Sequence, residues 1–209
     1  MGAQVATVAK QSQQSSVRVE AVVLIAELRN FTRMSEMLES DRVLALADQF
    51  FECAARVVHA HGGETRIVHP ASLLAPFRQG KAPEQARAAV RAAQQLFGDF
   101  DAVAQAWERD YGLRTAVALG VHHGPLVVGL AGPAAKRAEV VFGDCVSVAE
   151  RLVHRARAGE LVLSDSVMGV VSVAELELDA EPLPPVELHN RPPIRIYGVL
   201  RDDRLDFTA

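Results

Sequence analysis

Residues 22–32 read VVLIAELRNFT, and this stretch decides the fold of the chain. Five apolar residues come directly before one carboxylate, Glu27, and a short polar turn follows it. A continuous apolar run of this kind is typical of a strand that is buried on both faces of a sheet. The pattern therefore predicts a central strand over residues 19–26, with a single carboxylate at its end.

Composition limits what the rest of the chain can be. The 209 residues are 49% hydrophobic, enough to bury one core, so a single domain is expected. A net charge of −4 argues against a general nucleic-acid surface but allows one nucleotide to bind. Cys53 and Cys145 lie far apart inside apolar patterns, which favours buried free thiols over a disulfide. No apolar run is long enough to span a membrane and no signal peptide is evident, so we expect a cytoplasmic protein.

Three regions follow from the pattern along the chain. Residues 1–16 contain a polar Gln/Ser run and are expected to form a flexible lead-in. Residues 17–200 form one folded domain without an internal repeat, and residues 201–209 form a polar tail.

The predicted elements alternate between helices and strands. After the first strand we expect a short helix over 32–38, then a longer helix that Ser40 or Asp41 caps and that ends at Gly62-Gly63. The further predictions are strands at 64–68 and 73–77, a helix opened by Pro83, a hairpin of 113–121 with 126–131 across a turn at 122–125, a strand at 138–142, a helix at 146–157, a strand at 161–163, a short helix at 165–171, and strands near 173–178, 186–189 and 194–200. This order predicts an α+β fold with a ferredoxin-like βαββαβ core.

Five segments, in order, resemble the catalytic domain family of class III adenylate and guanylate cyclases. VVLIAELRNFT resembles the family pattern F-A-D-I-R-G-F-T, and LGVHHGPLVVGLAG resembles G-I-H-x-G-x-V-V-x-G-x-x-G. VVFGDCVSVAERL resembles V-I-G-D-x-V-N-x-A-A-R-L, and FFECAARVVHAHGG and ELHNRPPIRIYGVL are similar to two further blocks. The resemblance covers residues 17–199 and implies the cyclase fold, with C-terminal strands and a helix added to the ferredoxin-like core.

The resemblance also implies a chemistry. Cyclases of this family join the 3′-hydroxyl of ATP or GTP to the α-phosphate with two metal ions, which two carboxylates hold. Their sites lie in the interface of a head-to-tail dimer. One subunit supplies the carboxylates, and the partner supplies a purine-reading pair, an Asn that positions the ribose and an Arg that stabilises the transition state.

The metal-binding positions depart from the family. The first carboxylate corresponds to Glu27, whose extra methylene moves the oxygens by about a bond length. The second corresponds to Ala71, and a methyl group cannot ligate a metal. If a metal ion binds at Glu27, the resemblance implies Mg²⁺ or Mn²⁺. His69 suits zinc-type ions better than magnesium and is interpreted as a turn residue.

The partner-side positions depart as well. The purine-reading pair corresponds to Ile67 and Val140, which offer no hydrogen bond to a base edge. The ribose-positioning Asn corresponds to Ser147, whose hydroxyl reaches less far. Arg151 matches the transition-state Arg, and its guanidinium suits a phosphate group.

Phosphate contacts are the other function that the resemblance implies. The family binds phosphate with backbone amides at the start of the first helix, here Leu28, Arg29, Asn30 and Phe31. Asn30 tolerates the left-handed backbone that Gly adopts in the family. His189 and Arg191 are further candidates, near the family's phosphate-contacting turn.

Other conspicuous residues are interpreted as structural. His122 and His123 are adjacent in a strand and point to opposite faces, so they cannot bind one ion together. Gly124, Gly129 and Gly132 are interpreted as turn and close-approach glycines.

Three functions stay open at this level. The first is a catalytically impaired cyclase homology domain, a homodimer or a heterodimer with another cyclase-type domain, that acts in regulation or protein interaction. The second is an atypical cyclase with weak activity. The third is a nucleotide or phosphate sensor without turnover. Because the changes affect both halves of the composite site, the sequence favours the first.

Overall fold

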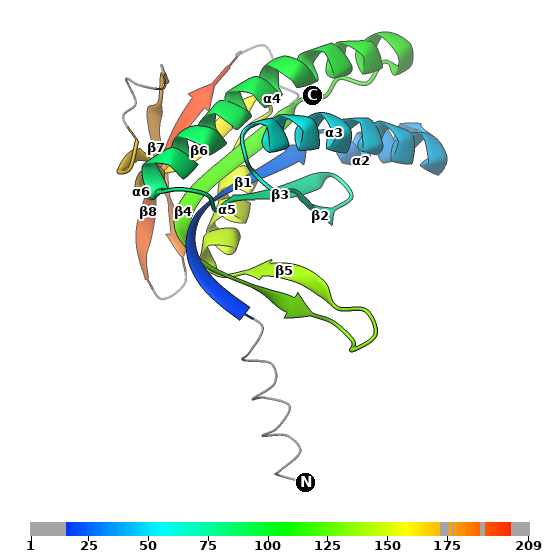
Figure 1. The fold of residues 1–209 in the computed structure, drawn as a ribbon. Helices are drawn as coiled ribbons and strands as arrows, with labels where there is room; N and C mark the ends of the chain where they lie inside the picture. The colour runs from blue at the N-terminus through cyan, green and yellow to red at the C-terminus, as the bar shows by residue number, and fades with distance from the viewer. Residues whose placement is uncertain (1–15, 172–175, 177, 189–190, 202–209) are drawn as a thin grey trace.

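A mixed sheet organises the chain in the computed structural model, which describes residues 16–171, 176, 178–188 and 191–201 (Figure 1). The strand order is β2-β3-β1-β4-β6-β8-β7, and β5 pairs with β4. The strands are β1 (Ser16–Leu28), β2 (Arg66–His69), β3 (Ser72–Phe77), β4 (Val117–Ala131), β5 (Ala138–Phe142), β6 (Glu160–Ser164), β7 (Glu181–Leu188) and β8 (Arg191–Leu200). The β2-β3-β1-β4 order confirms the predicted ferredoxin-like core.

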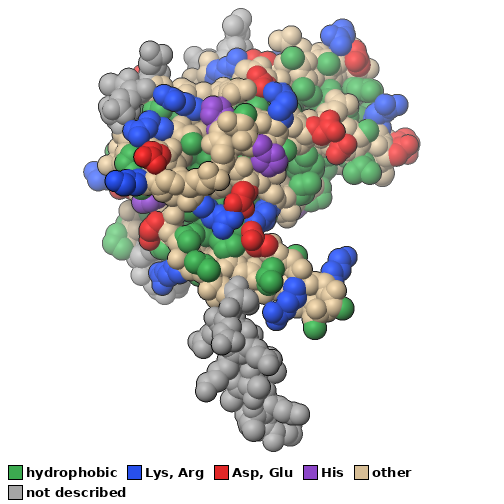
Figure 2. All heavy atoms as spheres, viewed as in Figure 1, with side chains coloured by type: hydrophobic (Ala, Val, Ile, Leu, Met, Phe, Trp, Pro, Cys, Tyr) green, Lys and Arg blue, Asp and Glu red, His purple; other side chains and the backbone are tan. Residues whose placement is uncertain are grey.

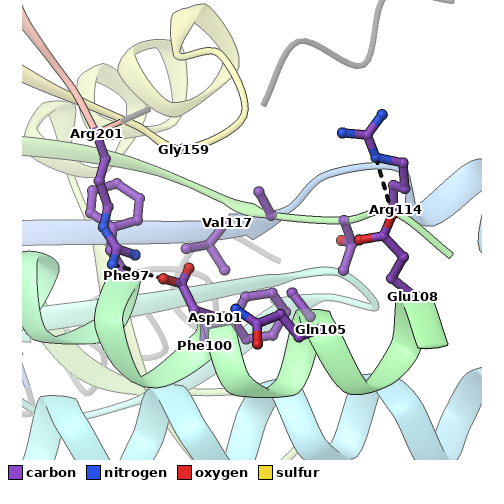
Figure 3. A pocket seen from close by; sticks show the side chains of 12 residues that line it. Phe97, Phe100, Asp101, Gln105, Glu108, Arg114, Val117, Gly159 and Arg201 are labelled. Atoms are coloured by element: carbon purple, nitrogen blue, oxygen red, sulfur yellow. Dashed lines mark ion pairs between the residues drawn. The ribbon is translucent and has the colours of Figure 1, made fainter. Parts of the chain in front are cut away.

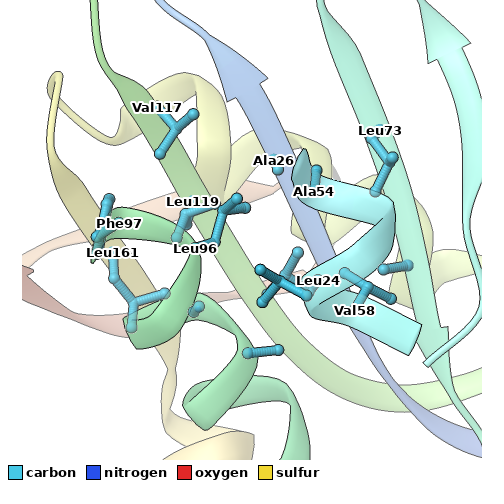
Figure 4. Close-up of a cluster of buried hydrophobic side chains, with 14 of the residues drawn as sticks. Leu24, Ala26, Ala54, Val58, Leu73, Leu96, Phe97, Val117, Leu119 and Leu161 are labelled. Atoms are coloured by element: carbon cyan, nitrogen blue, oxygen red, sulfur yellow. The ribbon is translucent and has the colours of Figure 1, made fainter. Parts of the chain in front are cut away.

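The central strand β1 is buried on both faces, as its apolar run predicts. Val22, Leu24 and Ala26 belong to one hydrophobic cluster, and Val23 and Ile25 belong to a second cluster on the opposite face. This division follows from the alternation of side chains along a strand. Figure 4 shows the first cluster, in which side chains of β1, β3 and β4 meet those of two helices.

Helices cover both faces of the sheet (Figure 1). The long helices α3 (Ser40–Ala60) and α4 (Ala82–Tyr111) pack on the first cluster, and α5 (Asp144–Arg155) packs on the second. The short helices are α2 (Phe31–Met37) and α6 (Asp165–Met168). Gly120 lets α5 lie very close to β4, because a Cβ there would stand 2.5 Å from the Val153 nitrogen and 2.7 Å from the Ala149 oxygen.

One predicted hairpin is wrong. Residues 117–131 form a single strand, β4, and residues 122–125 continue to pair with β1 instead of turning. On its other edge β4 pairs with β6 through Leu119–Val121 and with β5 from Val127 onward. Pro125 lies between the part of β4 that pairs with β6 and the part that pairs with β5. Within the described residues, no strand pairs with this edge of β4 at Pro125, so the missing N–H removes no hydrogen bond there. The actual hairpin joins β4 to β5, and Gly132 serves its turn with φ of 113°.

Most other element predictions are confirmed to within a few residues. The predicted cap of α3 is wrong, because Glu39 occupies that position and makes no side-chain capping bond. The predicted lead-in, the polar tail beyond residue 201 and most of the strand near 173–178 lie outside the described residues.

Candidate functional site

The first candidate site is a cleft of about 790 Å³ at the end of β1, called the metal-side cleft below. The β1–α2 turn, the β2–β3 turn and one face of α5 form its walls. Its lining residues are Ile25, Glu27, Leu28, Arg29, Asn30, Phe31, Thr32, Val68, His69, Ala71, Ser72, Glu150, Val153 and His154. The structure thus brings together Glu27, Ala71 and the four residues of the predicted phosphate loop.

The Glu27 carboxylate already contacts an arginine and a histidine within this cleft. Arg29 forms an ion pair with it, and His154 Nε2 lies 3.4 Å from its Oε2. Arg29 also donates to the carbonyl oxygens of Val153 and Ala156, the latter at 2.7 Å, at the C-terminal end of α5. A cation at a helix C-terminus is favourable because the last carbonyls carry partial negative charge. Arg29 therefore ties Glu27 to the end of α5.

Ala71 occupies the β2–β3 turn opposite Glu27, and its side chain is 5% exposed. Its carbonyl accepts the Leu28 N–H at 2.8 Å, but its methyl group supplies no ligand. Among the described residues, no group of three or more His, Cys, Asp or Glu side chains is arranged to hold a metal ion. The residues present do not fit a pair of divalent cations.

Two of the four backbone N–H groups in the predicted phosphate loop already donate hydrogen bonds within the chain. The N–H of Leu28 donates to Ala71 and that of Arg29 to the Ala116 carbonyl, each at 2.8 Å. Asn30 has φ of 66°, the left-handed conformation expected where the family has Gly. Phosphate contact by the amides of Asn30 and Phe31 stays a prediction.

The second candidate site is a cleft of about 410 Å³ between β2, β5 and α5, called the base-side cleft. It brings together Ile67, Val140 and Ser147, the three positions that the resemblance assigns to base and ribose. The other lining residues are Arg66, Val68, Leu74, Glu139, Val141, Phe142, Gly143, Val146 and Glu150. Figure 2 shows a hollow between the body and the projecting β4–β5 hairpin, where hydrophobic, acidic and basic side chains gather.

Arg151 lies outside the lining of both clefts. It follows Ser147 by one helical turn, so the two share the exposed face of α5. Its Nη1 donates to the Glu187 carbonyl of β7 at 3.3 Å. Of the other phosphate candidates, His189 lies outside the described residues and Arg191 begins β8.

Sequence reasoning missed Glu150, which lines both clefts. The signal was available, because Glu150 stands where the family pattern A-A-R-L has its second Ala. A carboxylate at this position raises the electrostatic cost of binding any polyphosphate in either cleft.

A second missed feature is an ion-pair network beside the base-side cleft. Arg66 pairs with Glu64 at 3.2 Å and also with Glu139, and Arg78 pairs with Glu64. The Arg66–Glu139 pair joins β2 to β5, and both residues line this cleft.

The two adjacent histidines point to opposite faces, as predicted. His122 is buried and its Nδ1 lies 2.8 Å from Ser164 Oγ, whereas His123 Nε2 lies 3.9 Å from Glu20 Oε2. The cysteines are free and buried, also as predicted. Burial raises the pKa of the Cys145 thiol to about 12 and that of Cys53 above its usual value.

Comparison with known proteins identifies the family of the chain that forms these two clefts. The profile of the family described as "Adenylate and Guanylate cyclase catalytic domain" matches residues 13–200. An adenylate cyclase of Anabaena cylindrica is 25% identical over 156 residues, 73% of this chain and 31% of that protein. Adenylate cyclase 1 of Rhizobium meliloti is 30% identical over 140 residues, 65% of this chain and 20% of that protein. The chain thus spans less than a third of either relative.

Solved structures share the fold. The adenylyl cyclase CyaB from P. aeruginosa superposes with a TM-score of 0.81 at 20% identity, over 90% of this chain and 97% of that chain. The dimeric guanylyl cyclase domain of the RhoGC fusion protein from Blastocladiella emersonii has a TM-score of 0.73 at 18% identity, over 88% of this chain and 98% of that chain.

No helix among the described residues is long and apolar enough to cross a membrane. The matched profile covers nearly all of the described sheet, together with both clefts and the helices that form their walls. The chain belongs to the adenylate and guanylate cyclase catalytic domain family.

Proposed function

We propose that this chain is a catalytically impaired cyclase homology domain that works as a dimeric regulatory or interaction module. The observation that carries the proposal is the state of the metal-side cleft. Its one carboxylate at a family metal position, Glu27, is paired with Arg29, and Ala71 stands at the other. The reaction of the family depends on two ions at these positions.

Electrostatics supports this proposal. The Arg29 guanidinium supplies one positive charge to Glu27, in a position from which it also holds the end of α5. A divalent cation at Glu27 would have to displace Arg29 or lie beside it, and either costs free energy. The longer side chain of Glu explains the arrangement, because its carboxylate reaches one bond further than that of Asp.

Pairing with an intact cyclase would not restore a normal site. As the metal-donating subunit, this chain lacks the carboxylate at Ala71. As the other subunit, it offers Ile67 and Val140 to the base and Ser147 to the ribose. Both half-sites are changed, so we expect the impairment in heterodimers as well as homodimers.

Dimerisation is supported by the apolar surface at the base-side cleft. Ile67 is 64% exposed, Phe142 is 62% exposed and Val68 is half exposed, and all three line this cleft. Exposed large apolar side chains gathered on one face mark a contact surface. The cyclase domain from Blastocladiella emersonii is described as a non-canonical dimer.

The test is a cyclase assay on purified protein with ATP or GTP and either Mg²⁺ or Mn²⁺, beside an adenylate cyclase of known activity. We expect no cyclic AMP or cyclic GMP above the no-enzyme background. Clear production that Glu27→Ala abolishes would overturn the proposal. It would favour the second candidate, a weakly active cyclase, which the names of the sequence relatives suggest.

A nucleotide or phosphate sensor is the third candidate. The left-handed Asn30 and the exposed Arg151 favour it, because both keep features that suit phosphate. A thermal-shift series with ATP, GTP and inorganic phosphate tests it, with Arg151→Ala as the control. A stabilisation that Arg151→Ala removes would support sensing, and no shift with any ligand would leave the interaction role alone.

A further inference from the structure

A third cavity, of about 400 Å³, shares no lining residue with either cleft (Figure 3). It lies between α4 and the chain segment 114–117 that leads into β4. Gly159, just before β6, and Arg201 complete its wall. Because its residues are separate from the cyclase positions, a ligand can bind here whether or not the two clefts form a working catalytic site.

The α4 wall carries a regular polar row. Asp101, Gln105 and Glu108 follow one another at intervals of four and three residues, so they share one face of the helix. The row spans about 10 Å along the helix axis. Beneath it lies an apolar floor made by Phe97, Phe100, Ala104 and Val117 (Figure 3).

An ion pair closes each end of this row. Arg201 Nη2 lies 2.7 Å from Asp101 Oδ2, and Arg114 Nε lies 3.5 Å from Glu108 Oε1. The charged side chains that line the cavity are therefore two cations and two anions, without a net formal charge. A charged ligand would have to compete with one of these pairs, whereas a neutral ligand can leave both intact.

We propose that this cavity binds a neutral heteroaromatic molecule of about nucleoside size. An aromatic ring suits the floor of two phenylalanines, and ring nitrogens or hydroxyls suit the Gln105 amide and the flanking carboxylates. The volume lies within the range of small-molecule sites.

The cavity is coupled to the β1–α2 turn by hydrogen bonds. Arg29 N–H donates to the Ala116 carbonyl at 2.8 Å, and Thr115 Oγ1 donates to the Arg29 carbonyl at 2.7 Å. Asn30 Nδ2 donates to the Arg114 carbonyl at 2.9 Å. A ligand that packs against segment 114–117 therefore affects the position of Arg29, the residue that pairs with Glu27.

The test uses amide NMR spectra of the ¹⁵N-labelled full chain titrated with adenosine, guanosine and caffeine, and with AMP as the charged counterpart of adenosine. We expect saturable shifts at Thr115, Ala116 and Gly159 with at least one neutral ligand, together with shifts at Arg29 and Asn30. AMP should bind at least about tenfold more weakly than adenosine.

Two leucine substitutions on α4 make the test specific. Ala104→Leu fills the cavity and should weaken binding by at least about tenfold, whereas Ala102→Leu is exposed outside the lining and should change nothing. The proposal is overturned if no neutral ligand gives saturable shifts, if AMP binds as well as adenosine, or if both variants bind alike. Shifts confined to the two clefts, or absent at Arg29 and Asn30, would contradict it as well.

Discussion

In the proposed assignment of the family positions, the two clefts differ from the family in opposite physical ways. The metal-side cleft is polar, and its Glu27 carboxylate is paired with the Arg29 guanidinium of the same cleft. The base-side cleft has Ile67 and Val140 in its lining and exposes apolar surface, with Ile67 and Phe142 both more than half exposed. In the metal-side cleft, the Glu27 charge is neutralised by an ion pair within the chain. At the base-side cleft, burial of the exposed apolar side chains by a partner chain would be favourable.

This difference separates two consequences that the family normally combines. Losing a metal site affects chemistry but leaves the surface polar. Gaining apolar surface favours contact with another protein chain. Helix α5 links the two, because Glu150 lines both clefts and the end of the helix is held by Arg29.

The largest expected effect comes from removing the internal cation of the metal-side cleft. Arg29→Met leaves Glu27 without its guanidinium partner and leaves two carbonyls of the α5 end without their donor. We expect the free energy of unfolding to fall by about 3 kcal/mol. Urea denaturation measures it. The exposed Arg56–Asp99 pair is the control, and Arg56→Met should leave the free energy of unfolding almost unchanged. Equal losses in both variants would refute a special role for Arg29.

The next effect tests the helix that both clefts share. Gly120→Ala places a Cβ 2.5 Å from the Val153 nitrogen, so α5 must move away from β4. We expect a loss of about 2 kcal/mol, again from urea denaturation. Gly98 on α4 has open space around it, and Gly98→Ala should instead stabilise by about 0.5–1 kcal/mol. The same sign in both variants would mean that packing of α5 on β4 is looser than described.

A smaller effect is expected at the base-side cleft. Ile67→Ser or Phe142→Ser removes exposed apolar surface and should raise the dimer dissociation constant about tenfold or more, by sedimentation equilibrium. Leu44 on α3 is 71% exposed outside both clefts, so Leu44→Ser should leave association unchanged. If all three behave alike, the base-side cleft is not the dimer contact.

The smallest effect concerns the thiol beneath the base-side cleft. Cys145 is the second residue of α5, and burial raises the pKa of its thiol to about 12 from the usual value of 9.0. An unfolded chain releases this proton at lower pH than the folded one, so the thiol's contribution to stability is lost as pH rises from about 9 to 12. Urea midpoints across this pH range should fall less steeply in Cys145→Ala. An unchanged slope would show that other groups control alkaline unfolding.

The sequence predicted the scaffold better than the site. The apolar alternation of β1 and the helical stripes of α3 and α4 depend on local periodicity, which a single sequence displays. The path of β4 was mispredicted because Gly124-Pro125 carries a local turn signal that pairing with β1 overrides. The positions of Glu27, Ala71, Ile67 and Val140 in two clefts followed from the resemblance. The pairing of Glu27 with Arg29 and His154 did not, since the α5 carbonyls orient the Arg29 side chain and His154 lies on α5, and both depend on tertiary geometry.

Binding of Mn²⁺ tests the central claim most directly. Electron paramagnetic resonance titration compares the natural chain with the double variant Glu27→Asp, Ala71→Asp, which restores both family carboxylates. We expect no saturable binding by the natural chain at about millimolar Mn²⁺, and binding at least about tenfold tighter in the variant. Binding of two ions per natural chain, as tight as in the variant, would contradict the account.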